Sequence, residues 1–149
     1  MTPKLDYAFT LHVDLAPPHD FGKTAGGEKR FVPITRGILP GGGDWNAARP
    51  DGVVHVFAKY TIQAEDGTLL NVTNEGYGRA SQETIKAVFG DEPSKASMAE
   101  GGAAWYTKTF PRFEVALGPL GWLNSACFVG DLLPPKVLNH VKIDVYEIL

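Results

Sequence analysis

The stretch VVHVFAKYTIQAEDGTLLNVT, from Val53 to Thr73, decides the fold class of this 149-residue chain. The turn sequence Ala64-Glu65-Asp66-Gly67 contains an Asp-Gly pair, which is typical of a tight hairpin. Before this turn, apolar side chains recur at every second position and share one face of an extended chain: Val54, Val56, Ala58, Tyr60 and Ile62. The stretch therefore predicts two antiparallel strands, Val53–Ile62 and Thr68–Thr73, joined by a hairpin turn.

Other segments on both sides of this hairpin have the character of strands. A period of two from Leu5 to Val13 predicts a half-buried strand with one solvent-exposed face. Pro111 divides one apolar run and marks a sheet edge or a bulge. The only good helix candidate is Ser81–Gly90, where Ser81 can cap the N-terminus and Gly90 can end it. The remaining predicted strands are Arg30–Ile34, Trp105–Phe110, Arg112–Leu117, Trp122–Val129 and Lys142–Ile148.

This pattern predicts one all-β domain over residues 1–149. Many strands separated by glycine- or proline-bearing turns are typical of an antiparallel barrel or sandwich. We expect an antiparallel β-barrel of the calycin or lipocalin kind with one short helix. A small closed barrel can enclose one small ligand.

Composition and charge exclude several classes of partner. Hydrophobic residues make up 44% of the chain, which is a globular composition, and the net charge of −3 offers no basic surface for nucleic acid. No apolar stretch approaches the length of a membrane span, and the N-terminal residues do not form a signal peptide. Cys127 is the single cysteine, so we expect no internal disulfide, an inert buried thiol and a cytoplasmic location.

The motifs of the common cofactor and metal enzymes are missing from the sequence. There is no phosphate-binding P-loop, no G-x-S-x-G motif and no complete dinucleotide-binding glycine pattern. The four histidines have no spacing that would pair them on a metal ion. A cofactor-independent activity without a metal, or no activity, is the expectation that remains.

A glycine-rich segment precedes the hairpin and carries chemistry-bearing side chains. LPGGGDWNAARPDG, Leu39 to Gly52, predicts a loop that closes with an Arg49-Pro50-Asp51-Gly52 turn. This loop would present Asp44, Trp45 and Arg49 to a ligand. The alternative is an irregular connection held by a salt bridge.

Further candidates lie on the predicted strands, and each has a structural alternative. Glu114 is a buried acid with a raised pKa if its face of the strand points into the barrel. It belongs to a solvated charged surface if that face points outward, and this second interpretation is favoured because most Glu side chains are exposed. Trp105 and Trp122 are more often core residues than ligand platforms. Tyr60 is expected inside, where its hydroxyl needs a ligand or a side chain as partner.

The order of these motifs resembles the DUF3237 (UPF0311) family over nearly the whole chain, from Leu5 to Leu149. The similarity rests on R-F-V-P-I, L-P-G-G-G-D-W, R-x-D-G, Y-T-I-x-x-x-D-G, N-x-G-x-G-R, F-E-V, W-L-N-x-x-x-F-V-G and a closing V-Y-E-I. The resemblance implies a small β-barrel, often a homodimer, without a known cofactor. Members in fungal gene clusters are associated with ring-forming or isomerising steps on polyketide-like compounds, so it implies a fungal-type member of secondary metabolism.

One departure from the family pattern adds a candidate. Bacterial members usually carry G-G-x-F-x-G-P after V-P-I, whereas here Thr35-Arg36-Gly37 runs almost directly into Ile38-Leu39-Pro40. A shortened hairpin tip would reshape the mouth of the pocket, and Arg36 becomes a candidate pocket residue.

The function predicted from sequence is a cofactor-free cyclase or isomerase that acts by proton transfer. Asp44 or Glu114 would protonate an alkene or enone, and a substrate hydroxyl would then add within the same molecule. The predicted catalytic residues are Asp44, Glu114 and Tyr106. The predicted substrate-binding residues are Arg36, Trp45, Arg49, Tyr60, Arg79, Trp105, Trp122 and Asn124. Two alternatives stay open, a non-catalytic barrel that binds a small molecule and a structural dimer with a filled core.

Overall fold

The computed structural model describes residues 2–36, 39, 41–79, 105–137 and 139–149. The helix predicted at Ser81–Gly90 lies outside these residues. Within them the chain is almost entirely antiparallel β-structure, with one short 3₁₀ turn, η1, at Gly121–Asn124. The strands are β1 (Leu5–Leu15), β2 (His19–Thr24), β3 (Gly27–Arg36), β4 (Gly43–Ala48), β5 (Val53–Gln63), β6 (Leu69–Arg79), β7 (Tyr106–Val115), β8 (Phe128–Leu132) and β9 (His140–Ile148).

The hairpin that decides the fold class is confirmed as β5 and β6. The two strands pair antiparallel from Val53 opposite Arg79 to Gln63 opposite Leu69. The Ala64 N–H donates to the Thr68 carbonyl at 2.8 Å, and Gly67 takes a φ of 86°, which its missing side chain permits. The return strand is longer than predicted, because alternation continues through two inward-facing glycines, Gly76 and Gly78.

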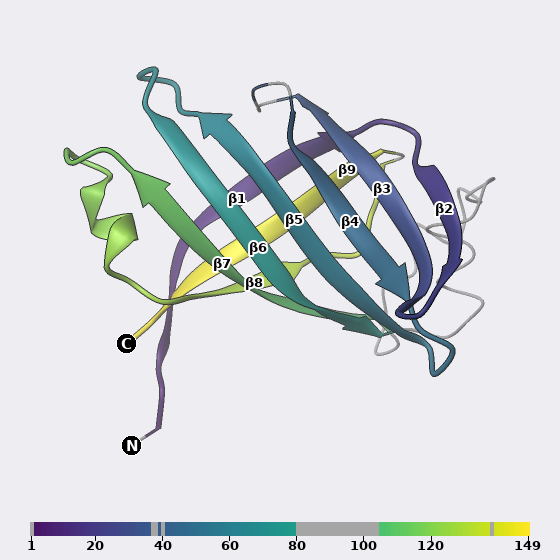
Figure 1. The fold of residues 1–149 in the computed structure, drawn as a ribbon. Helices are drawn as coiled ribbons and strands as arrows, with labels where there is room; N and C mark the ends of the chain where they lie inside the picture. The colour runs from purple at the N-terminus through teal and green to yellow at the C-terminus, as the bar shows by residue number, and fades with distance from the viewer. Residues whose placement is uncertain (1, 37–38, 40, 80–104, 138) are drawn as a thin grey trace.

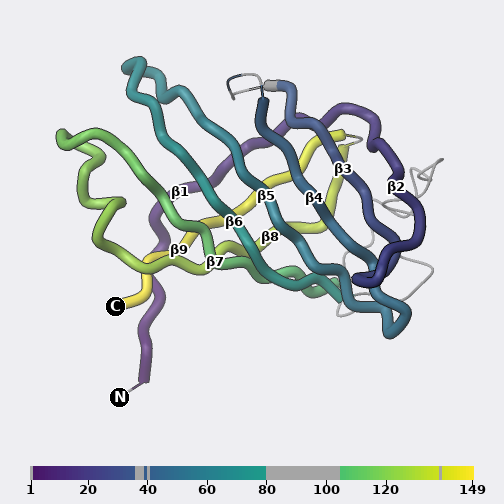
Figure 2. Tube along the Cα trace, viewed as in Figure 1, coloured from purple at the N-terminus to yellow at the C-terminus, as the bar shows by residue number. Residues whose placement is uncertain are grey.

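The nine strands form one sheet that curls into a ring, as Figure 1 shows. Their order is β1-β9-β8-β7-β6-β5-β4-β3-β2, and a further pairing between β1 and β3 joins the two ends of the sheet. This seam consists of the pairs Asp14 with Arg36 and Leu15 with Ile34, with an irregularity between them. The long strands cross the ring obliquely, as the tube in Figure 2 shows.

Two strands are not predicted from the sequence: no strand is expected at β2, and β4 lies within the segment predicted as a loop. In both short segments the polar residues hide the alternation. All six residues of β2 are exposed, and β4 places Asp44 and Asn46, not apolar side chains, towards the interior. The glycines before β4 therefore predict a loop as far as Gly52, where the structure has a strand.

Two details of the predicted strands also differ. Strand β7 continues through Pro111, which pairs with Asn74 on one side, while β8 pairs only with Lys108 and Thr109 on the other. Pro111 thus lies on a part of β7 that has no paired strand on the β8 side. Because no strand there would accept a hydrogen bond, the missing N–H of proline is tolerated. Trp122 belongs to η1 and not to a strand, and Cys127 is exposed, so the prediction of a buried thiol is wrong.

The inward-facing side chains of the strands pack into a hydrophobic core in one part of the ring. Val72 and Val145 are fully buried there, and Phe113 packs edge-on against Phe128 with ring centroids 5.1 Å apart. Tyr60 belongs both to this core and to the cavity beside it. In the part of the chain that the structure describes, no helix has the length and hydrophobicity needed to span a membrane.

Candidate functional site

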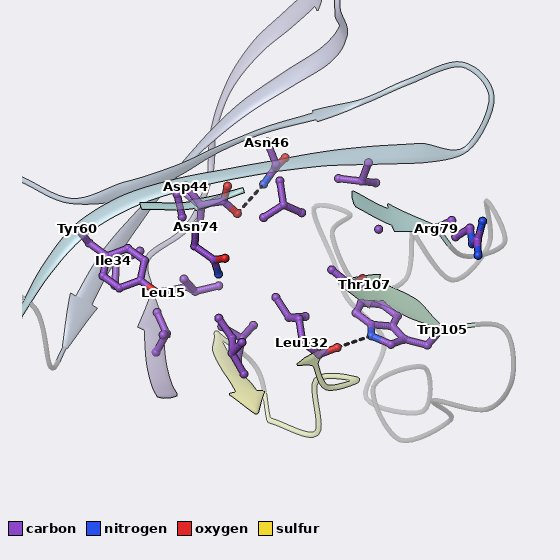
Figure 3. Close-up of a pocket in the computed structure, with 18 residues that line it drawn as sticks. Leu15, Ile34, Asp44, Asn46, Tyr60, Asn74, Arg79, Trp105, Thr107 and Leu132 are labelled. Atoms are coloured by element: carbon purple, nitrogen blue, oxygen red, sulfur yellow. Dashed lines mark hydrogen bonds between the residues drawn. The ribbon is translucent and has the colours of Figure 1, made fainter. Parts of the chain in front are cut away.

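A cavity lies inside the ring beside this core, and the space between its lining atoms, open solvent at its mouth included, is about 860 Å³. Eighteen described residues line it, and Figure 3 shows their side chains. Most are aliphatic and come from strands all around the ring, among them Val13, Leu15, Val32, Ile34, Val54, Val56, Leu132, Val141 and Ile143. Such walls suit an apolar molecule, and the few polar groups among them fix how that molecule is oriented.

Asp44 is the carboxyl group among these lining residues. Its Oδ2 atom accepts a hydrogen bond from the Asn46 amide at 3.4 Å, whereas its Oδ1 atom is buried and has no partner in the described part of the chain. Burial raises the pKa of Asp44 from 3.8 to about 6, against the opposing effects of Asn46, the Phe57 backbone N–H and the charge of His55. At neutral pH both forms of this carboxyl group are therefore accessible.

Strand β4 brings Asp44 inside. Asp44 pairs with Ala58 of β5, and alternation along β4 sends Asp44 and Asn46 into the cavity and Trp45 to the opposite face. On that outer face the Trp45 ring packs between Phe31, at 5.0 Å, and Phe57, at 6.4 Å. Trp45 is therefore not placed to stack on a ligand in the same cavity as Asp44.

The glycines before Asp44 allow close packing of β4 on its neighbours. A Cβ atom at Gly42 would lie 2.6 Å from the Cβ atom of Tyr60, and one at Gly43 would lie 2.1 Å from the Phe31 ring. The glycine run is thus needed for the approach of two aromatic side chains, one of which lines the cavity.

Tyr60 and Asn74 complete the polar part of the cavity. Tyr60 is 4% exposed and Asn74 is 2% exposed, and both side chains line the cavity. The Tyr60 hydroxyl and the Asn74 Oδ1 atom are buried without a hydrogen-bond partner among the described residues. Burial, followed by the negative charge of Asp44, raises the pKa of Tyr60, so its hydroxyl stays protonated.

Arg79 and Trp105 line the cavity at a distance from this polar group, on the other side of the view in Figure 3. The Trp105 indole N–H donates to the Leu132 carbonyl at 2.9 Å, which fixes the ring in the cavity wall. The Arg79 guanidinium lies 4.2 Å from the centroid of the Tyr106 ring. Tyr106, a predicted catalytic residue, is 40% exposed and does not line the cavity, so its contact is with Arg79.

Glu114 lies outside the ring, which corrects the prediction of a second acid in the cavity. Alternation along β7 buries Phe113 and Val115 and leaves Glu114 exposed. One Glu114 carboxylate oxygen accepts a hydrogen bond of 3.5 Å from the Asn71 amide on the neighbouring strand. The outward interpretation, favoured because most Glu side chains are exposed, is confirmed.

Two other candidates, Arg49 and Trp122, also lie away from the cavity. Arg49 forms an ion pair with Asp51 in the turn before β5, where the Gly52 N–H donates to the Arg49 carbonyl at 3.1 Å. Trp122 is 42% exposed and packs on Phe128. Arg36 ends β3, and its side chain lies outside the described part of the structure.

Asn124 has a structural task that the sequence did not reveal. Its amide accepts a hydrogen bond from the Val115 N–H and donates one to the Val115 carbonyl, both at 2.9 Å. The side chain therefore replaces a neighbouring strand at the end of β7.

Asn46, Asn74 and Thr107 line the cavity but were not among the predicted site residues. Asn74 carried a usable signal, because it stands in phase with the inward-facing Leu70 and Val72 on β6. Asn46 could be found only once β4 was recognised as a strand. No group of three or more metal-ligating side chains gathers anywhere in the described residues.

The fold and this cavity define a class of small all-β proteins with a ligand-sized interior. The chain belongs to the family described as "Protein of unknown function (DUF3237)", whose model matches residues 3–148. A UPF0311 protein of Bradyrhizobium diazoefficiens is 29% identical, with 100% of both chains covered. This relative is bacterial and gives no support to the finer prediction of a fungal-type member of secondary metabolism.

Solved structures of other proteins share the fold. A protein described as β-barrel-like, from Acinetobacter baumannii, has a TM-score of 0.78 and 25% identity, covering 100% of this chain and 98% of its own. A structure described as an enzyme from Penicillium herquei is more distant, with a TM-score of 0.62 and 17% identity, covering 100% of this chain and 96% of its own. The family has no established catalytic function, and at 17% identity the second likeness concerns the fold alone.

Proposed function

We propose that the protein is a cofactor-independent isomerase or cyclase that moves a proton on an aromatic or polyketide-like small molecule. The observation that carries this proposal is the environment of Asp44, which lines a mostly aliphatic cavity and whose buried Oδ1 atom has no hydrogen-bond partner among the described residues. An acid with a pKa near the working pH is suited to general acid–base catalysis, because it can both give and accept a proton.

Asp44 serves both halves of the proposed reaction, since it is the one carboxyl group among the described lining residues. In its acid form Asp44 gives its proton to an alkene carbon of the substrate. A hydroxyl oxygen of the same molecule forms a bond to the neighbouring carbon, and the hydroxyl proton passes to the Asp44 carboxylate. The substrate and the product are isomers, and the carboxyl group returns to its starting form.

The cavity walls supply the other part of the rate enhancement. Trp105 and the aliphatic side chains would hold an extended ring system and keep the hydroxyl close to the alkene. Proton transfer from a positioned side chain typically contributes about 10²–10⁴-fold.

The test is a screen of aromatic compounds that carry a hydroxyl and a nearby alkene, followed by NMR in D₂O. The expected result is ring closure or alkene isomerisation with one deuterium on carbon, lowered at least about 100-fold by Asp44→Asn. Glu114→Gln removes an exposed carboxyl from the outer face and is the matched control, with full activity expected. Full activity in Asp44→Asn would contradict the proposal.

Turnover with none of the compounds, together with tight binding of several, would support the non-catalytic binding protein instead. That function uses the same cavity and aromatic side chains but does not require a titrating acid.

A further inference from the structure

The cavity presents two neutral polar groups that the proton transfer does not use. These are the Tyr60 hydroxyl and the Asn74 amide oxygen, both buried and without a partner in the described structure. Leaving such a group unpaired costs free energy, so a ligand that pairs with it gains affinity over one that does not. The fourth atom of this kind, the Thr109 hydroxyl, belongs to a residue that does not line the cavity.

The register of the sheet brings these groups together. Asp44 pairs with Ala58, and Ala58 pairs with Asn74, so the three residues form one row across β4, β5 and β6. Asp44 and Asn74 are two strands apart, about 10 Å between backbones, with the small Ala58 side chain between them. Tyr60 is the next inward-facing residue of β5, and Figure 3 shows it beside Asp44 and Asn74.

Ala58 leaves room above the sheet at the centre of this row. A ligand atom positioned over Ala58 would have Asp44 on one side, Asn74 on the other side and Tyr60 beside it. The other polar side chains of the lining belong to Asn46, Arg79 and Thr107, and most of the remaining lining residues are aliphatic.

The hydrogen-bonding types of the two groups select one kind of polar substituent. The Tyr60 hydroxyl remains protonated and can donate, while the Asn74 amide oxygen can only accept. A hydroxyl group on the ligand matches both, because it accepts one hydrogen bond and donates another. A ketone or an ether has no hydrogen to give and would leave the Asn74 oxygen unpaired.

We infer that Tyr60 and Asn74 form a subsite over Ala58 that binds a hydroxyl group of an otherwise apolar ligand, next to Asp44. This inference rests on the proposed function for its reaction, since it names the substituent that Asp44 would act on. It stands without turnover as a statement about binding, because the two side chains are neutral and do not take part in proton transfer.

The experiment compares 2-naphthol with 2-methoxynaphthalene and naphthalene, which share one ring system and contain no alkene substituent to react. Isothermal titration calorimetry at pH 7 gives the ratio of their dissociation constants. For the unmodified protein we expect 2-naphthol to bind at least about tenfold more tightly than its methyl ether.

Asn74→Leu and Tyr60→Phe should each bring the dissociation constants of 2-naphthol and its methyl ether closer together. The main change should be weaker binding of 2-naphthol. Tyr77→Phe is the matched control, since it removes a tyrosine hydroxyl from the exposed outer face of β6 and should keep the preference. Thermal melts of each variant confirm that it folds, and two independent variants protect the test against the failure of one.

The outcomes separate the two proposals. A preference for 2-naphthol that both variants abolish supports the hydroxyl subsite, even if no compound in the alkene screen is turned over. Equal binding of the alcohol and its methyl ether, or a preference that survives both variants, overturns the subsite, even if Asp44→Asn abolishes turnover.

Discussion

Burial raises the pKa of two cavity side chains, Asp44 and Tyr60, with opposite chemical consequences. It raises the pKa of Asp44 to about 6 and so brings its acid form into the range of neutral solution. It also raises the pKa of Tyr60, so the hydroxyl keeps its proton and can donate a hydrogen bond. One environment thus produces a group that exchanges protons beside a group that only binds.

The raised pKa of Asp44 predicts that this residue destabilises the folded protein as pH rises. Between pH 3.8 and about 6 the folded state holds the Asp44 proton while the unfolded state has released it. Raising the pH from 4 to 8 should therefore lower the free energy of unfolding through this group, by at most about 3 kcal/mol. Urea denaturation of the wild type and of Asp44→Asn across this range measures the effect.

With rising pH, the free energy of unfolding of the wild type should fall relative to that of Asp44→Asn. This change should level off above about pH 7. Glu114→Gln, which removes an exposed carboxyl, should not reproduce this curve. A difference that stays constant with pH would contradict a buried, titrating Asp44. For a substrate that is turned over, kcat/KM should fall above about pH 6, since the first step needs the acid form.

Strand β4 shows why part of the site could not be predicted from the sequence. The β5–β6 hairpin was predictable because apolar alternation and an Asp-Gly turn agree over its length. In β4 the inward positions are Asp44 and Asn46, so the residues that make the site are the same ones that conceal the strand. The sequence predicts Asp44 and Trp45 together on a ligand-facing loop, whereas the strand places Asp44 in the cavity and Trp45 on the outer face.

Strand β7 shows the converse case. The alternation of Phe113 and Val115 with Glu114 is visible in the sequence, but alternation alone does not say which face points inward. Only the pairing of β7 with β6, which places Phe113 opposite Val72, decides it.

The close approach of β4 and β5 predicts the effect of a single added methyl group. Gly42→Ala would place a Cβ atom 2.6 Å from the Cβ atom and 2.9 Å from the Cα atom of Tyr60, so the strands must separate. We expect a loss of about 1–3 kcal/mol in the free energy of unfolding and weaker binding of 2-naphthol, because Tyr60 moves. Chemical denaturation and calorimetry measure the two effects.

Gly26→Ala is the matched control for this change. Its added Cβ atom would lie 3.8 Å from the Thr24 hydroxyl oxygen, an ordinary contact. Stability and binding of this variant should stay within about 0.5 kcal/mol of the wild type. If Gly42→Ala behaved in the same way, Gly42 would not be needed for the packing of Tyr60.

The closure of the ring is the least predictable property of the molecule, and it is also what makes the cavity. Only two residue pairs join β1 to β3, and neither strand carries a sequence signal for the other. The residues of the pair Leu15 and Ile34 both line the cavity, one from each side of the seam. A ligand in the cavity would therefore contact both ends of the sheet at once, and its binding free energy would favour the closed ring.

This arrangement predicts where a ligand protects backbone amides from hydrogen exchange. In the free protein β2, which pairs only with β3 among the described strands, should exchange fastest, and the β5–β6 hairpin slowest. Saturating 2-naphthol should slow exchange most at the seam, where the Ala16 N–H donates to the Pro33 carbonyl at 2.8 Å. The β2 amides serve as the internal reference and should change little, because this strand does not line the cavity. Equal protection of every strand would mean that the ligand only stabilises the protein globally, and no protection at the seam would mean that cavity and closure are not coupled.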